Sequence, residues 1–250
     1  MHRFFVSPEL VQHATPGTHI QLSSPLAHQV RDVLRLANDE QLVLLDNTGE
    51  EFVARVSKTS KVVVEVEIVT RQKGKEESHV RITLCQGLMK SARFEWILEK
   101  GTELGVSTFA PMQCRRSLSG LENAGASKVQ RWQHIVQEAA EQCGRARLPE
   151  LLPIRPFETL LTHIPTGTLT LIPWEEERTQ SLRDVLRANM REGEGPEAIM
   201  VFIGPEGGLT PEEIQLAQRS GVQPVTLGQR ILRAETAALA AISSVMYELE

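Results

Sequence analysis

The sequence has few of the residues that mark secreted, metal-binding or membrane proteins. Its 250 residues include three cysteines, Cys85, Cys114 and Cys143, with no CxxC pair and no HExxH motif. Their odd number and wide spacing argue against a disulfide framework or a zinc site, and favour idle thiols in a reducing cytoplasm. No apolar run reaches the roughly 18 residues that cross a bilayer. Met1–Val6 contains no apolar signal core, so we expect a cytoplasmic protein that binds no metal.

An excess of basic charge is also missing. Lysine and arginine number 27 against 32 aspartates and glutamates, which gives a formal net charge of −5. This balance argues against nucleic-acid binding over the whole surface but leaves room for a local basic face. The 41% hydrophobic and 24% charged content is typical of a chain with a packed core.

Residues 1–70 have the pattern of short strands joined by tight turns. Segments 40–45 and 52–56 flank Asp46-Asn47-Thr48-Gly49, which is a hairpin signal. Segment 61–69 alternates mostly valine and isoleucine with glutamate, as a half-buried strand does. We therefore expect a small β-barrel over this part of the chain.

One helix is expected to interrupt these strands. Ser24 is a suitable cap and Pro25 a suitable first residue. Val30, Val33 and Leu34 are then predicted to share the apolar side of the helix.

Residues 71–79 are polar and without periodicity, so we expect an interdomain linker there. Over residues 80–250, apolar strand-like segments alternate with amphipathic helical ones. This alternation is typical of a largely parallel sheet that helices cover on both faces. The predicted fold class is therefore α/β, with a second, smaller β domain at the N-terminus.

The most informative segment is Ala198–Glu213. An apolar strand ends at Ile203, the turn Gly204-Pro205-Glu206-Gly207-Gly208 follows, and residues 210–213 form a helix start with a capping box. This arrangement lets backbone N–H groups approach a ligand closely. The turn lacks both the Gly-Lys-Ser/Thr ending of a P-loop and the GxGxxG spacing of a dinucleotide fold. Taken alone, it also fits an ordinary strand-to-helix connection.

A second unusual turn, Leu227–Thr236, follows close behind. Both turns, and the segment Leu171-Ile172-Pro173, are expected at the carboxyl ends of strands, where open α/β sheets bind their ligands. No lysine, metal cluster or acidic pair accompanies them. We therefore expect a small, neutral or mildly charged cofactor held by backbone groups.

The two turns together resemble the signature of a known family. Gly204-Pro205-Glu206-Gly207-Gly208, followed by Leu227-Gly228-x-x-Ile231-Leu232-Arg233-x-Glu235-Thr236-Ala237, is similar to the signature of the ribosomal RNA small subunit methyltransferase E family, in the SPOUT superfamily. The similarity extends over nearly the whole chain. Its further segments are Met1–Phe5, His28–Arg35, Lys90, Glu103–Val106, Arg115–Ser117 and Glu138–Gln142.

The resemblance implies methyl transfer from S-adenosylmethionine to N3 of a specific uridine in 16S ribosomal RNA. It further implies a PUA-like RNA-binding barrel over residues 1–70 and a trefoil-knotted methyltransferase domain over residues 80–250. The expected partners are small-subunit ribosomal RNA or the assembled small subunit, and a second copy of the chain in a homodimer.

The resemblance also implies which residues form the site. The expected cofactor-binding residues are Leu171, Ile172, Ile203, Gly204, Pro205, Glu206, Gly207, Gly208, Leu227, Gly228, Ile231, Leu232, Arg233, Glu235 and Thr236. The expected RNA-binding residues are Arg3, Arg31, Arg35, Arg115, Arg116, Gln142 and Arg145.

Methylation of a uridine at N3 requires the N3 proton to leave. A cation that stabilises the uridine anion would help, and Arg233 is the candidate for that role. Glu206 and Glu235 are candidates for the base, or they hydrogen-bond the loops as acidic residues near helix starts often do. Arg233 has its own structural alternative, which is an ion pair with one of these two glutamates.

Two rival functions remain open from the residues. One is a related methyltransferase that acts on transfer RNA or on another base. The other is an RNA-binding module whose cofactor site has lost its activity. The intact glycine turns favour an enzyme over the second rival.

Overall fold

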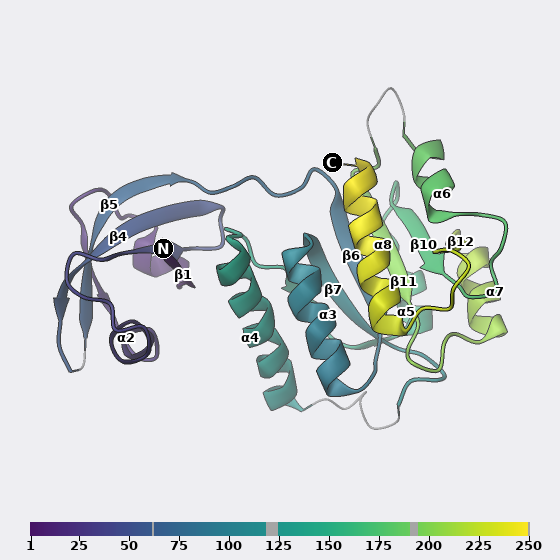
Figure 1. Ribbon diagram of the computed structural model, residues 1–250, viewed down its shortest axis with the longest axis horizontal. Helices are drawn as coiled ribbons and strands as arrows, with labels where there is room; N and C mark the ends of the chain where they lie inside the picture. Colours follow the sequence, from purple (N-terminus) through teal and green to yellow (C-terminus); the bar gives the residue numbers. More distant parts are fainter. Residues whose placement is uncertain (62, 119–124, 191–194, 250) are drawn as a thin grey trace. The chain divides into compact units, whose positions relative to one another are not determined.

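The computed structural model describes residues 1–61, 63–118, 125–190 and 195–249 (Figure 1). It divides into two compact units. The N-terminal unit combines Met1–Glu77 with Ala140–Leu148, and the C-terminal unit combines Ser78–Ala139 with Pro149–Glu250. No helix in the described part of the chain has the length and apolarity needed to cross a bilayer.

The N-terminal unit is built on a five-stranded sheet with the order β1-β3-β4-β5-β2. Its elements are β1 (His2–Phe5), α1 (Pro8–Val11), β2 (His19–Leu22), α2 (Leu26–His28), the π-helix η1 (Gln29–Val33), β3 (Gln41–Leu45), β4 (Glu50–Thr59) and β5 (Val64–Lys73). The predicted hairpin is confirmed, since β3 and β4 pair antiparallel across the turn. The recorded pairing leaves β1 and β2 at the two ends of the order. The sheet is therefore open in the described residues, and the closed barrel stays a proposal.

The strand predicted at 61–69 alternates as expected. Val64, Val66 and Ile68 are fully buried, while Glu65 and Glu67 are only partly covered. The first valine of the predicted pattern, at position 62, lies outside the described residues. The strand also continues to Lys73, so the first three positions of the expected linker at 71–79 are strand.

The predicted N-terminal helix differs in its winding. Pro25 precedes α2 without a side-chain cap, and α2 passes directly into the π-helix, in which the Leu34 N–H donates to the carbonyl of Gln29. A π-turn takes more residues than an α-turn, so the buried stripe shifts along the sequence. Val30 is fully buried, whereas Val33 is 63% exposed. The prediction of Val33 on the apolar side was wrong for this reason.

The segment Ala140–Leu148 belongs to the N-terminal unit, although it was expected inside the domain at 80–250. The carboxylate of Glu141 accepts a hydrogen bond from the Phe5 N–H at 2.9 Å. Ala146 is buried in one apolar cluster with Val43. The N-terminal unit is therefore discontinuous in the sequence.

The C-terminal unit contains a parallel sheet with the order β12-β10-β11-β6-β7-β8, and β9 pairs with β7. The strands are β6 (Arg81–Gly87), β7 (Val106–Gln113), β8 (Glu150–Leu151), β9 (Arg155–Pro156), β10 (Leu169–Pro173), β11 (Ala198–Ile203) and β12 (Gln223–Val225). The helices are α3 (Ser91–Glu103), α4 (Ala126–Cys143), α5 (Phe157–Leu161), α6 (Leu182–Ala188), α7 (Pro211–Arg219) and α8 (Ala234–Leu249). Residues 140–143 at the end of α4 belong to the N-terminal unit. The predicted α/β class with a mostly parallel sheet is confirmed.

Helices cover both faces of this sheet (Figure 1). Side chains of α3, α4, α6 and α8 form one apolar cluster with one set of strand residues, and α5 and α7 form another with the alternate set. The neighbouring residues Val201 and Phe202 of β11 accordingly lie in different clusters. Both faces are buried, as parallel sheets require.

The strand order places the candidate turns together. β12, β10 and β11 are consecutive neighbours in the sheet and run in the same direction. The loops that follow their carboxyl ends must therefore lie side by side at one edge.

Candidate functional site

Three turns at the carboxyl ends of β10, β11 and β12 enclose a cavity of about 250 Å³. Its walls are formed by Pro173–Glu175 and Arg178, by Ile203–Leu209, and by Thr226–Gly228, Arg230–Ala234 and Ala237. We call the last two walls the 204–209 turn and the 226–233 turn. The sequence predicted that these three loops converge at one sheet edge, and the structure confirms it.

The 204–209 turn is fixed by its own backbone and by the helix behind it. Gly208 has φ +71°, and its N–H donates to the carbonyl of Pro205 at 2.9 Å. The predicted capping box at the start of α7 is confirmed. Thr210 Oγ1 accepts from the Glu213 N–H at 3.3 Å, and Glu213 Oε2 accepts from the Thr210 N–H at 2.8 Å. The turn is therefore held in place before any ligand binds.

The end of β6 packs against the 204–209 turn. The sequence analysis did not predict this contact. A Cβ added to Gly87 would lie 2.6 Å from the backbone nitrogen of Pro205, so no side chain fits there. The buried Gln86 donates from Nε2 to the carbonyl of Gly204 at 3.4 Å. The available signal was a Gln-Gly pair directly after a buried strand.

The 226–233 turn depends on a glycine in the left-handed half of the φ range. Gly228 has φ +120°, and its N–H donates to Thr226 Oγ1 at 3.2 Å. The Thr226 backbone also bonds the loop that follows β10. Its N–H donates to the carbonyl of Gln180, and its carbonyl accepts from the N–H of Leu182. The loop that follows β10 and the 226–233 turn are therefore joined by backbone hydrogen bonds.

More charged side chains line the cavity than the sequence analysis predicted. Arg233 and the unpredicted Arg178 and Arg230 all line it, and all three are exposed. No ion pair holds any of them within the described residues. The carboxylate of Glu175, also unpredicted, lies beside Gly208. A ligand here therefore meets free cations as well as backbone groups.

The candidate carboxylates are paired by an arginine that the sequence analysis did not single out. Arg93, in the first turn of α3, places Nη1 2.6 Å from Glu206 Oε1 and Nε 3.6 Å from Glu235 Oε1. A cation at a helix N-terminus opposes the helix dipole. That local conflict was the signal that Arg93 has an acidic partner elsewhere.

Four predicted cofactor residues do not line the cavity. Leu171 and Ile172 are fully buried in β10, and only the next residue, Pro173, reaches the cavity. Glu235 and Thr236 lie in the first turn of α8, next to the lining residues.

Two predicted RNA-binding arginines are engaged inside the N-terminal unit. Arg3 forms an ion pair with Glu51, whose side chain is 5% exposed. Arg145 is 12% exposed and pairs with Glu77, with Nη2 2.5 Å from Oε2. Both guanidinium groups therefore stabilise this unit.

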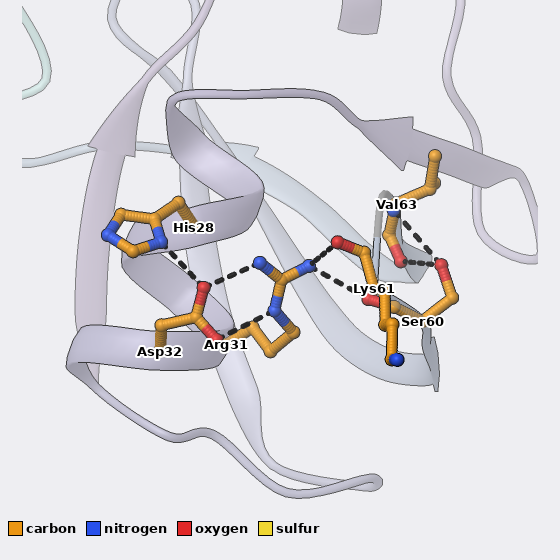
Figure 2. A network of polar contacts seen from close by, with 6 residues as sticks. All are labelled: His28, Arg31, Asp32, Ser60, Lys61 and Val63. Atoms are coloured by element: carbon orange, nitrogen blue, oxygen red, sulfur yellow. Dashed lines mark hydrogen bonds and ion pairs between the residues drawn. The ribbon is translucent and has the colours of Figure 1, made fainter.

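Arg31 is engaged more fully, as Figure 2 shows. It donates from Nε and Nη2 to the carboxylate of Asp32, and from Nη1 to the carbonyls of Ser60 and Lys61 at 2.9 and 2.5 Å. The Arg31 hydrogen bond is the main cause that lowers the pKa of Asp32 to about 2, and His28 adds to the effect. Arg31 thus fastens the π-helix to the loop before β5.

The other RNA candidates lie at the surface. Arg35 and Gln142 are exposed in the N-terminal unit, and Arg35 has φ +55°. Arg115 is 59% exposed in the C-terminal unit. Arg116 donates from Nη1 to the carbonyl of Gly207 at 3.1 Å, so it supports the 204–209 turn directly.

Comparisons with known proteins agree with this geometry. A family model described as an RNA methyltransferase domain matches residues 76–246, which include every residue of the cavity. The chain is 33% identical, with a TM-score of 0.86, to a ribosomal RNA small subunit methyltransferase E from Neisseria gonorrhoeae solved with bound S-adenosyl methionine. That likeness covers 100% of this chain and 98% of the other. A Legionella pneumophila protein solved with the cofactor SAM is 29% identical, with a TM-score of 0.82, over 99% of this chain and 97% of the other.

Curated relatives match over the same length. The ribosomal RNA small subunit methyltransferase E of Bacillus subtilis (strain 168) is 31% identical, over 100% of this chain and 98% of the relative. The protein of the same name from Synechocystis is 34% identical, over 100% of this chain and 78% of the relative. The resemblance drawn from the two glycine turns is therefore confirmed, and this chain belongs to the ribosomal RNA small subunit methyltransferase E family.

Proposed function

We propose that this protein transfers a methyl group from S-adenosylmethionine to N3 of one uridine in 16S ribosomal RNA. Its family makes it an S-adenosylmethionine-dependent methyltransferase of ribosomal RNA. The observation that carries the site is the convergence of three turns inside the region that the RNA methyltransferase model matches. The base and the atom methylated are the finer part of the proposal and rest on the family resemblance.

The residues of the cavity fit S-adenosylmethionine. Gly208 and Gly228, both at positive φ, present backbone polar groups without side chains in two of the walls. Glu175 and Arg178 offer both signs of charge, which suits the ammonium and carboxylate of an amino-acid moiety. We assign cofactor contacts to Ile203–Gly208, Leu227, Gly228 and Ile231–Arg233. When bound there, S-adenosylmethionine supplies an electrophilic methyl group.

Arg233 is our candidate for charge stabilisation at the acceptor. As the N3–carbon bond forms and the sulfur–carbon bond breaks, the N3 proton leaves and the uracil ring carries negative charge. A free guanidinium in the cavity wall favours that charge. Arg233 has no ion pair in the described chain, which sets it apart from Glu206 with its Arg93 partner.

We assign RNA contacts to Arg35, Arg115 and Gln142, because their side chains are exposed. Arg115 is paired with Glu212 at 3.6 Å, but both side chains face solvent, so an RNA phosphate can replace the carboxylate. Arg116 lies beside the 204–209 turn and is a candidate for contact with the nucleotide that enters the cavity. The N-terminal unit would then act as the PUA-like docking module, with small-subunit RNA or the assembled subunit as its partner. The uridine must leave its stack to reach the cavity.

A knotted C-terminal domain and a homodimer complete the proposal. The backbone pairing of Thr226 with the 180–182 segment supports a chain path in which the last loops pass closely across one another. Helix α8 presents Ala240, Ser243 and Ser244 beside the 86% exposed Tyr247, and small residues of this kind permit close packing of a second copy. We place the reaction in the cytoplasm, where ribosomal RNA is assembled into subunits.

The decisive test is the modified nucleoside. Labelled S-adenosylmethionine and the protein are incubated separately with small subunits lacking the modification, free 16S RNA, large subunits and transfer RNA. We expect 3-methyluridine in the small subunits or the 16S RNA alone. Label in transfer RNA, or in another base, would favour the related methyltransferase. Calorimetry without any S-adenosylmethionine binding would favour the non-catalytic RNA-binding module.

A further inference from the structure

We infer that Arg93 is a positioning residue that ties the two turns of the cofactor cavity together through Glu206 and Glu235, and that neither carboxylate is the base. The inference deepens the proposed function and rests on it, because it concerns the same cavity.

One guanidinium reaches both turns. Arg93 Nη1 lies 2.6 Å from Glu206 in the 204–209 turn, and Nε lies 3.6 Å from Glu235, which follows the 226–233 turn at the start of α8. These two walls come from distant parts of the sequence, and Arg93 joins them from a third element, α3. The planar fork of arginine suits two carboxylates at once, which a lysine would contact as a single point charge.

The burial of the three side chains makes this contact stronger than an ordinary surface pair. Arg93 is 35% exposed, Glu206 23% and Glu235 15%. The second oxygen of Glu235 is buried and has no hydrogen-bond partner in the described part of the structure. Removing Arg93 would therefore leave Glu235 with a partly buried charge that no other recorded ion pair compensates.

The helix dipole does not explain the position of Arg93. It lies in the first turn of α3, where a positive charge is unfavourable and where no acidic residue offsets it. Glu235, in contrast, lies in the first turn of α8, where its charge is favourable. The arginine is therefore placed for the two turns and not for its own helix.

The pairing also bears on the chemistry. A carboxylate that accepts a charge-assisted hydrogen bond from a guanidinium is a poor proton acceptor, because its protonation breaks the pair. Glu206 accepts such a hydrogen bond from Arg93 Nη1, and Glu235 is the second carboxylate in an ion pair with the same guanidinium, at 3.6 Å. We therefore assign them to the architecture of the cavity and leave proton removal to water or to a group on the RNA.

Calorimetry with S-adenosylmethionine tests the positioning role without RNA. Arg93→Ala and Glu206→Gln should each weaken cofactor binding by roughly tenfold, and the double variant by little more than either single one. Arg93→Lys should recover only part of the affinity, because an ammonium group contacts the two carboxylates as a single point charge. The matched control is Arg131→Ala. It removes an ion pair of two hydrogen bonds with Glu95, which lies in α3 like Arg93 but outside the cavity. Its affinity should stay within about twofold of the wild type.

Kinetics at saturating cofactor separates positioning from base catalysis. Glu206→Gln should keep kcat within about threefold and retain the pH profile of the wild type, because only the binding step is affected. A roughly hundredfold loss of kcat, together with loss of the low-pH limb of the profile, would make Glu206 the base and overturn the inference. Unchanged cofactor affinity in Arg93→Ala, or fully additive effects in the double variant, would overturn it as well.

Two further outcomes are informative. If Arg93→Ala fails to fold, the nearly isosteric Glu206→Gln and Glu235→Gln decide the question by the same binding measurement. If the wild type itself binds no S-adenosylmethionine, the proposed function fails, and the inference fails with it. A wild type that binds while all these variants bind equally well refutes the inference alone.

Discussion

Two sets of arginines, one in each unit, play different roles. In the N-terminal unit, Arg3, Arg31 and Arg145 each pair with a carboxylate of the same unit. Around the cavity of the C-terminal unit, Arg230 and Arg233 carry no ion pair within the described residues. Both groups look alike in the sequence. The difference teaches that a free guanidinium, and not a basic residue as such, marks the surface that is available to a ligand.

The largest test of this comparison is the removal of a free arginine. Arg233→Ala should lower the single-turnover methylation rate by roughly a hundredfold, because the charge on the uracil ring loses its partner. S-adenosylmethionine affinity should be nearly unchanged, which calorimetry can measure, and Arg131→Ala serves as the control for loss of an arginine. A parallel fall in affinity would show that Arg233 shapes the turn instead. A wild-type rate would refute both roles.

The next test concerns the backbone of the cavity. Gly228 and Gly167 both have positive φ, +120° and +81°, and an added Cβ meets nothing within 4 Å at either position. Valine should strain the backbone at both sites by about 1–2 kcal/mol. Of these two glycines, Gly228 lines the cavity and Gly167 does not, so Gly228→Val alone should weaken cofactor binding by roughly tenfold or more. Equal affinities in both variants would remove Gly228 from the site.

A third test separates two arginines that the sequence treats alike. Removing Arg3 leaves the buried carboxylate of Glu51 without its ion pair, so Arg3→Gln should cost about 1–2 kcal/mol of stability by denaturant titration. Arg35 is exposed at φ +55°, a conformation that asparagine tolerates. Arg35→Asn should spare stability and lower the salt dependence of RNA binding by roughly one phosphate contact. An unchanged salt slope would exclude Arg35 from the RNA surface.

The smallest expected effect is a pH dependence of stability that arises in the loop after β10. Hydrogen bonds from the Thr179 hydroxyl and N–H, and from the Gln180 N–H, lower the pKa of Glu177 from 4.5 to about 2. The folded state therefore gains stability that is complete above pH 4.5 and is lost as the pH falls towards 2. The Tm difference between wild type and Glu177→Gln should therefore be constant above pH 4.5 and shrink as the pH falls towards 2. Glu176→Gln, at the exposed neighbouring position, is the control for loss of a carboxylate.

Local signals in the sequence predicted much of this structure. The capping box at Thr210 and the hairpin at 46–49 depend on neighbouring residues alone, and both are present. The π-helix after His28 depends on how its side chains pack, which the propensities of single residues do not encode.

Contacts between distant segments were the part that could not be read. The pairing of Arg93 with Glu206 joins residues 113 positions apart, and the partners of Arg3 and Arg145 are also far away in sequence. Residue type shows what a side chain is able to do, whereas folding decides which neighbour it meets. The cavity was predictable because its turns are local and its strands are parallel.

The discontinuity of the N-terminal unit has a consequence for synthesis on the ribosome. Residues 1–77 emerge first, but the apolar cluster around Val43 and Leu45 gains Ala146 only after a long intervening stretch has been made. The nascent sheet must therefore wait with that cluster incomplete, at translation rates of roughly 5–20 residues per second. A chain truncated after Glu77 would keep this unfinished surface permanently. The first segment to be translated thus reaches its final packing only after residues 140–148 have been made.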